Sequence, residues 1–306
     1  MTERLCTMKV TGVGGVILDV TEWGSRSDPT IVLVHGFPDD HSVWNSIADL
    51  LSDRFHIVAF DVRGAGRSSR PRRVREYALT YLDGDLKAVA RALSPHRRVH
   101  LVGHDWGSVQ AWHSATQAGA DALFASLTSI SGGSLDHVPT WVGTRLRSGR
   151  DGRRAVLSMW KSPFYMGFLA APLLARLACR AGLTDLTIEW AHRFEVGRRP
   201  DHLGSHRARR NHASSKIYTA NLFPKLARPT PRRNAIPTRV IAPTSDFFIT
   251  PHTSTLGKEW SDDFTVHEVD GGHWAAAFNP LPIAESIADH VGSVEARGPQ
   301  PKEVIR

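Results

Sequence analysis

The chain has little cysteine, and its start lacks the features of a secretion signal. Its 306 residues include two cysteines, Cys6 and Cys179, which lie far apart in the sequence and form no metal-ligand pattern. The opening segment, MTERLCTMKVTG, has neither an apolar core nor a small-residue cleavage site. We therefore expect a cytoplasmic protein in a reducing compartment, without a structural disulfide.

Long hydrophobic runs are also missing. The most apolar stretch, residues 164–183, is interrupted by Arg176 and Arg180. Charges at the centre of a bilayer span are unfavourable, so we expect no transmembrane helix. The 25 glycines and 18 prolines are spread along the chain, which excludes a collagen-like or broadly disordered protein.

The charge is unbalanced, with a formal net charge of +8. Basic residues concentrate at residues 145–154, 198–210 and 228–233. Such patches bind nucleic acid or anionic membranes in some proteins, but in most they are solvated faces. No helix-turn-helix, zinc-finger or RNA-binding signature accompanies them. We expect no nucleic-acid partner, and peripheral contact with a membrane remains an open alternative.

Strand and helix patterns alternate in the first part of the chain. Residues 81–93 place leucine and valine at helical spacing. Apolar, β-branched runs typical of buried strands occur at residues 30–35, 56–62, 99–103 and 123–130, and residues 15–23 are expected to form an opening hairpin. Strands separated by helices predict a parallel sheet.

The pattern changes after residue 132. Helical segments follow without a convincing strand, until strands resume at residues 238–242 and 264–269 and a helix closes the pattern at 281–291. A helical insert of this kind would cover the carboxyl ends of the strands, where open α/β sheets bind ligands. We predict a core of residues 1–132 and 237–291, a helical cap of residues 133–236, and a tail or interdomain linker of residues 292–306.

The strongest local motif is Gly103-His104-Asp105-Trp106-Gly107, between a predicted strand and a predicted helix at residues 108–117. A nucleophile elbow needs small residues two positions before and after its centre, because the backbone makes a sharp, strained turn there. Both glycines are present, and the central residue is aspartate. The competing interpretation is a glycine-flanked aspartate that caps a helix.

Two further residues complete a catalytic triad in the order that this fold requires. Asp246 follows the strand at residues 238–242, and His273 follows the strand at 264–269. Both stand just past the carboxyl ends of their strands, where side chains converge on the elbow. The backbone N–H groups of Phe37, within HGFP, and of Trp106 are predicted to form an oxyanion hole.

Together, HGFP, DVRGAGRS (residues 61–68), GHDWG, the Asp246 loop and GGHW resemble the epoxide hydrolases of the α/β-hydrolase fold, over roughly residues 15–291. The resemblance implies a mostly parallel sheet flanked by helices, with an inserted cap. In DVRGAGRS we interpret Asp61 and Arg63 as structural. The chain also resembles longer proteins that join such a hydrolase domain to a C-terminal short-chain dehydrogenase domain.

An aspartate nucleophile implies a particular chemistry. Asp105 would attack an sp3 carbon and form an alkyl ester, which water activated by His273 would hydrolyse while Asp246 orients the imidazole. The resemblance also implies two cap tyrosines, Tyr165 and Tyr218, as proton donors to the epoxide oxygen, because a phenol with a pKa of about 10 suits an alkoxide leaving group. The alternative is that these tyrosines are packing residues.

Two other functions are weighed against an epoxide hydrolase. Haloalkane dehalogenases share GHDWG, but their second halide donor is often an asparagine where this chain has Phe37, although a cap tryptophan (Trp141, Trp160 or Trp190) would be a substitute. Fluoroacetate dehalogenases share HGFP but usually carry arginine at the position of Trp106. A non-catalytic small-molecule receptor would show a lost triad residue, and none is missing.

The expected partners are a small hydrophobic epoxide and water. The apolar segment at residues 164–174 favours a lipid-derived or xenobiotic epoxide. The proposed mechanism needs no cofactor, and no His/Asp/Glu cluster has the spacing of a metal site.

Overall fold

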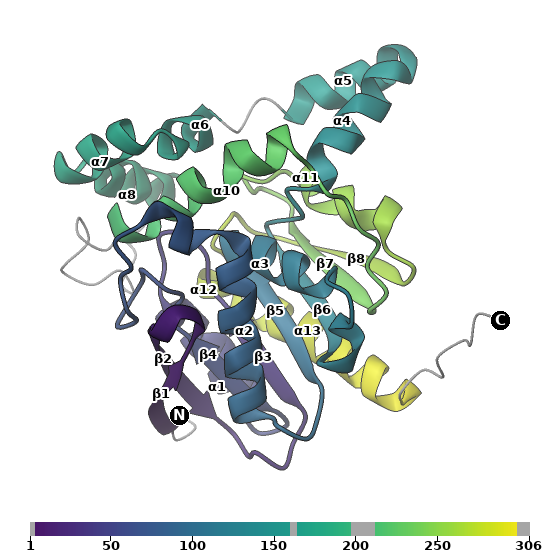
Figure 1. Cartoon of the computed structure of the whole chain (residues 1–306). Coiled ribbons are helices and arrows are strands. Elements are labelled where there is room, and N and C mark those ends of the chain that lie inside the picture. Colours follow the sequence, from purple (N-terminus) through teal and green to yellow (C-terminus); the bar gives the residue numbers. More distant parts are fainter. Residues whose placement is uncertain (1–3, 160–163, 197–211, 299–306) are drawn as a thin grey trace.

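A computed structural model describes residues 4–159, 164–196 and 212–298 (Figure 1). Its centre is one eight-stranded sheet in the order β1-β2-β4-β3-β5-β6-β7-β8. β1 is antiparallel to β2 and β2 to β4, while all the other neighbouring pairs are parallel. The predicted mostly parallel sheet is therefore confirmed. The strands are β1 Arg4–Thr11, β2 Ile17–Trp23, β3 Thr30–Val34, β4 His56–Phe60, β5 Val99–His104, β6 Phe124–Ile130, β7 Thr238–Pro243 and β8 Phe264–Val269.

Strand β1 is the one strand that the sequence pattern missed. It lies at the edge of the sheet and pairs only with β2. Among the β1 residues whose side chains are described, Met8 and Val10 pack against the hydrophobic core, so the apolar alternation seen there is short and weak.

The buried strands explain the continuous apolar runs in the sequence. Along β3, Ile31 and Leu33 pack into one hydrophobic cluster, and Val32 and Val34 pack into the other. Because successive side chains of a strand point to opposite faces, a strand covered on both sides must be apolar at every position. The covering helices of the two faces are α1 Asn45–Leu51, α2 Leu79–Leu93, α3 Trp106–Ala115 and α13 Pro280–Arg297.

The segment of residues 133–236, the cap segment, contains helices and no strand within its described residues. These helices gather at one end of the molecule, above the sheet in the view of Figure 1. They are α4 His137–Arg147, α5 Gly149–Met159, α6 Phe164–Ala170, α7 Pro172–Arg180, α8 Leu183–Val196 and α10 Lys216–Ala227. Among the described helices, none is both long enough and apolar enough to cross a membrane.

The closing helix is longer than expected. α13 continues past Gly292 to Arg297. Val294 is buried in that last part. Val294 lies about one turn after the buried Val291, so both share the buried face of the helix, and this packing outweighs the low helix propensity of Gly292. Residues 299–306 of the expected tail lie outside the described part of the chain.

Candidate active site

The elbow between β5 and α3 positions Asp105 in a strained backbone conformation. Asp105 has φ 53° and ψ −121°, and besides Ser131 it is the only described non-glycine residue with positive φ. The flanking glycines are required by contact: a Cβ on Gly103 would lie 2.5 Å from the carbonyl oxygen of Gly107, and a Cβ on Gly107 would overlap the carbonyl oxygen of Val34. Helix α3 therefore packs directly against the sheet and presents Asp105 at its start.

The two other predicted triad residues meet Asp105 from the loops after β7 and β8. His273 Nδ1 donates to Asp246 Oδ2 at 3.0 Å. The opposite ring nitrogen, Nε2, lies 3.6 Å from Asp105 Oδ2. Asp246 Oδ1 also accepts the backbone N–H groups of Phe248 and Ile249, each at 2.8 Å. The imidazole thus lies between two carboxylates. It is oriented by Asp246, which accepts more hydrogen bonds than Asp105 does.

Asp105 also faces the predicted oxyanion-hole donors. The backbone N–H of Phe37 donates to Asp105 Oδ1 at 2.9 Å, and that of Trp106 also donates to the carboxylate. Burial raises the pKa of Asp105 to about 6, although His273 and these two N–H groups favour the ionised form. At neutral pH the side chain is a poorly solvated carboxylate, which is a suitable state for a nucleophile.

The loop that carries Phe37 is held by His35. Val62 N–H donates to His35 Nε2 at 3.0 Å, so the ring proton is on Nδ1, which donates to the carbonyl of Gly36 at 2.8 Å. His35 is not among the residues predicted from the sequence, and its position as the first residue of HGFP was the available signal.

A second buried histidine, His104, supports the catalytic one. Its Nε2 donates to the backbone carbonyl of His273 at 2.8 Å, and the two ring centroids are 4.8 Å apart. Burial lowers the pKa of His104 to about 4, so the ring is neutral and holds the His273 loop without adding charge. The sequence analysis treated His104 only as part of the GHDWG motif.

An apolar pocket opens over these groups. Tyr218 of α10 is among its lining residues and is almost fully buried, with its ring 5.4 Å from that of Phe37 and 4.7 Å from that of Trp106. The complete lining is Phe37, Pro38, Asp105, Leu169, Ala178, Leu183, Thr184, Thr187, Tyr218, Phe248, His273 and Trp274.

The other aromatic candidates lie elsewhere or beyond description. Tyr165 belongs to helix α6, and its side chain lies outside the described part of the structure, as does the whole of Trp160. Trp141 is buried beside His252, with ring centroids 5.4 Å apart, and Trp190 is 57% exposed on α8. Trp141 and Trp190 are not among the residues that line the pocket.

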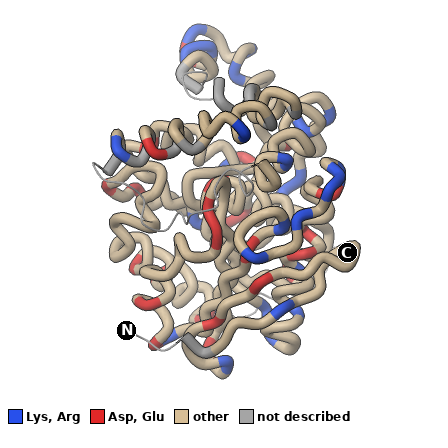
Figure 2. The backbone as a smooth tube through the Cα atoms, turned by 90° about the vertical axis from the view of Figure 1, so that its left-hand side faces the viewer, with Lys and Arg blue, Asp and Glu red and all other residues tan. Residues whose placement is uncertain are grey.

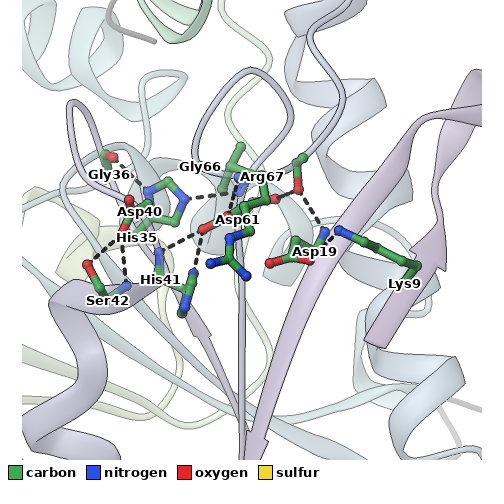
Figure 3. Close-up of polar contacts among 12 residues, drawn as sticks. Lys9, Asp19, His35, Gly36, Asp40, His41, Ser42, Asp61, Gly66 and Arg67 are labelled. Atoms are coloured by element: carbon green, nitrogen blue, oxygen red, sulfur yellow. Dashed lines mark hydrogen bonds and ion pairs between the residues drawn. The ribbon is translucent and has the colours of Figure 1, made fainter. Parts of the chain in front are cut away.

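The DVRGAGRS loop has a structural explanation (Figure 3). Asp61 Oδ1 accepts from both the backbone N–H and Nδ1 of His41, at 2.9 and 2.8 Å, and Asp61 Oδ2 accepts from Arg67 N–H at 2.6 Å. Nearby, the Lys9 ammonium pairs with Asp19. Asp19, His41 and Asp61 offer ligand atoms within 4.8 Å of one another, a grouping that the sequence spacing does not reveal. Both oxygens of Asp61 and one oxygen of Asp19 are engaged by the protein's own donors, which accounts for the grouping as a network that closes the loop.

Arg63 of the same loop makes a buried ion pair. Its Nε and Nη2 donate to the two carboxylate oxygens of Asp85 on α2, each at 2.6 Å. The two remaining contacts run to the backbone carbonyls of Val13 and Glu76. Bidentate pairing of this kind fixes geometry, so Arg63 joins the loop to α2 and to the turn between β1 and β2.

Comparison with known proteins agrees with this fold. The chain matches the alpha/beta hydrolase fold family over residues 29–280, and it belongs to that family. The protein named "Probable oxidoreductase EphD" of Mycobacterium tuberculosis is 32% identical over 295 residues, which are 93% of this chain and 49% of the relative. The chain thus spans about half the length of the first relatives that it matches. "Epoxide hydrolase A" of the same organism is 37% identical over 108 residues, 35% of this chain and 33% of that protein.

Solved structures show the same fold. A mutant epoxide hydrolase from Bacillus megaterium, complexed with its product, matches with a TM-score of 0.72 and 20% identity over 93% of this chain and all of that one. A structure of epoxide hydrolases found in metagenomes from hot environments matches with a TM-score of 0.70 and 24% identity, covering 94% of this chain and 98% of that one. The resemblance that the motifs predicted is confirmed.

Proposed function

We propose that the chain is an epoxide hydrolase that converts a hydrophobic epoxide and water to a vicinal diol through an ester on Asp105. The observation that carries the proposal is the placement of a buried aspartate at the elbow, beside His273 and beneath a pocket that Tyr218 also lines. A serine at this position would attack acyl carbons, whereas a carboxylate attacks an sp3 carbon.

In the first step, a carboxylate oxygen of Asp105 forms a bond to one epoxide carbon while the carbon–oxygen bond of the ring breaks. The electron pair goes to the epoxide oxygen, which takes a proton from the hydroxyl of Tyr218, with Tyr165 as the second donor that the family resemblance implies. Burial of Asp105 favours this step, because a poorly solvated carboxylate loses little hydration when its charge is neutralised in the ester.

In the second step, His273 Nε2 takes a proton from water, and the resulting hydroxide attacks the carboxyl carbon of Asp105. The N–H groups of Phe37 and Trp106 stabilise the oxyanion of the tetrahedral intermediate. Collapse breaks the ester bond and releases Asp105 as a carboxylic acid, whose proton restores the phenolate that Tyr218 became in the first step. The departing alkoxide takes the proton from the imidazolium. Asp246 stabilises that imidazolium through Nδ1.

Dehalogenation and ligand reception are supported less well. A halide needs N–H donors around it, and the described candidates Trp141 and Trp190 do not line the pocket, whereas the hydroxyl-bearing Tyr218 does. A receptor would not require the hydrogen bond from His273 to Asp246, which leaves the opposite ring nitrogen 3.6 Å from Asp105.

The test is turnover of a panel of aromatic and long-chain epoxides, with 1-haloalkanes as controls, measuring both diol and halide. We expect diol from the wild type and none from Asp105→Ala. Tyr218→Phe should slow ester formation by about 10- to 100-fold, because it removes one of two general acids. Tyr81→Phe removes the same hydroxyl outside the pocket and should leave the rate unchanged. Halide without diol would identify a dehalogenase, and equal rates for Tyr218→Phe and wild type would show that Tyr218 is a packing residue.

A further inference from the structure

Two neighbouring helices of the cap segment present apolar stripes to the outside. On α8 the exposed residues recur at the spacing of one helix face, which in most globular proteins packs against a core. They are Leu183, Leu186, Trp190 and Phe194, with exposed fractions of 53%, 62%, 57% and 67%. Exposed apolar surface on this scale marks an interaction site.

The adjacent helix enlarges this surface. α7 packs against α8 and exposes Leu173, Leu174 and Leu177, at 67%, 48% and 53%. We call these three leucines and the four α8 residues the cap stripe. The same two helices also line the pocket, through Ala178 of α7 and through Leu183, Thr184 and Thr187 of α8. Because Leu183 belongs to the cap stripe and also lines the pocket, the stripe borders the pocket directly.

A chain of aromatic rings joins the cap stripe to the catalytic histidine. Trp190 stacks on Phe194, with ring centroids 5.5 Å apart, and Phe194 lies 6.3 Å from Phe247. Phe247 contacts Phe248 at 5.6 Å, and Phe248 contacts His273 at 5.1 Å. Phe247 is 50% exposed, and Phe248 lines the pocket. These rings form a continuous apolar track from the surface to the reacting groups.

The positive charge of the protein belongs to the same part of the chain. Residues 133–236 carry 19 Lys and Arg against 6 Asp and Glu, a net charge of +13, whereas the rest of the chain carries 19 against 24, a net charge of −5. Lys and Arg colour the uppermost coils in Figure 2, where the cap segment lies. Arg180 ends α7 and Arg193 lies in the last turn of α8, both exposed beside the stripe.

We propose that the cap stripe docks on an anionic lipid bilayer, and that a lipophilic epoxide passes from the bilayer along the aromatic track into the pocket. Apolar and tryptophan side chains insert at the bilayer interface while arginines pair with lipid phosphates. A second copy of the chain fits this face less well, because it would bring two segments of +13 together. Docking is independent of the reaction, whereas delivery of the epoxide rests on the proposed function.

Docking is tested by sedimentation of the full chain with vesicles of phosphatidylcholine, alone or with phosphatidylglycerol, at low salt. We expect at least about tenfold stronger partitioning onto the anionic vesicles, and a loss of about tenfold in the double variant Trp190→Ala, Phe194→Ala. Phe223→Ala is the matched control, because Phe223 is a 56% exposed aromatic residue of α10 outside the stripe. Partitioning equal to wild type in the double variant would overturn the proposal. Failure of the wild type to bind anionic vesicles would also overturn it. If the wild type then formed dimers that dissociate in the double variant, the stripe would be a contact between two copies of the chain.

Delivery is tested by comparing diol formation from an epoxide embedded in anionic vesicles with that from the same epoxide dispersed in detergent. We expect the ratio of the two rates to fall by about tenfold in the double variant and to stay at the wild-type value in Phe223→Ala. An unchanged ratio in the double variant would overturn delivery. Absence of diol from both substrates would instead contradict the proposed function, while the sedimentation result would still decide docking.

Discussion

At the scale of single residues, two carboxylates of one site differ because their surroundings differ. Burial alone would raise the pKa of Asp246, but His273 and the N–H of Ile249 outweigh it, so its pKa lies below the ordinary value. At Asp105 the neighbouring histidine and N–H groups do not offset burial, which raises its pKa to about 6. When the surroundings separate the pKa values of two acids in one site, the two acids typically have different catalytic roles. In the proposed mechanism the first acid stays ionised to support an imidazolium, and the second is kept poorly solvated for attack.

Asp105→Asn should stabilise the protein at high pH and not at low pH. The folded pKa of about 6 exceeds the ordinary value of 3.8, so ionisation disfavours folding. This destabilisation is absent while both states are protonated, below about pH 4, and complete above about pH 6. The difference between a pKa of 3.8 and one of about 6 corresponds to about 3 kcal/mol of folding free energy. Urea unfolding of both proteins at about pH 4 and about pH 8 measures it. An equal gain at both pH values would show that the charge is not responsible.

At the scale of elements, the site is made where strands end. The carboxyl ends of β5, β7 and β8 lead into the residues that carry Asp105, Asp246 and His273, and parallel pairing places those ends at one edge of the sheet. α3 begins directly at Asp105 and packs on β3 without a side chain between them at Gly107. The chemistry therefore depends on how closely one helix approaches the sheet.

Gly107→Ala should destabilise the protein and abolish turnover. Its added methyl group would overlap the carbonyl oxygen of Val34, so α3 must move away from the sheet. We expect the free energy of unfolding to fall by at least about 2 kcal/mol. Gly292→Ala is the control, because that position in α13 has no atom within 4 Å of the added Cβ, and a gain of up to about 1 kcal/mol is expected. Urea unfolding of both variants measures these changes in the free energy of unfolding. A Gly107→Ala variant as stable as wild type would contradict the packing argument.

At the scale of the whole molecule, buried charges connect strands that hydrophobic contacts alone would not align. Glu22 on β2 accepts from His56 Nε2 of β4 at 2.9 Å and from Arg26 at 2.8 and 2.9 Å. His56 Nδ1 lies 3.1 Å from the hydroxyl of Thr30 on β3. This network joins the antiparallel edge to the parallel strands. Although burial raises the pKa of Glu22, the donors outweigh it and lower that pKa to about 2.

Glu22→Gln should weaken the fold at neutral pH and flatten its acid response. Because the folded pKa of Glu22 is depressed, its contribution to stability is complete above about pH 4.5 and is lost as the pH falls toward 2. The variant should lose roughly 1–3 kcal/mol at pH 7, since its amide cannot accept from all these donors. Its loss of stability between about pH 5 and pH 2.5 should be smaller than that of wild type. Thermal unfolding across this range tests the expectation, and parallel curves would contradict it.

Much of the fold and of the site could be predicted from the sequence. The elbow and the runs that form β3 to β8 depend on residues close together in the chain, where turn chemistry and side-chain period operate. The order Asp105, Asp246 and His273 could be predicted because this fold fixes the order of the triad along the chain. The edge strand β1 was missed, because half-exposed edges have weak patterns.

The sequence by itself determined most of the elements, the position of Asp105 at the elbow and the class of fold. The tertiary structure alone decided which distant side chains meet: His104 with the His273 loop, Asp19 with His41 and Asp61, and Tyr218 with the pocket. It also decided that the apolar stripe of α8 faces outward, although the same spacing in a sequence predicts a buried face. The physical reason is that periodicity records which residues share a face, whereas packing across the whole chain determines what that face meets.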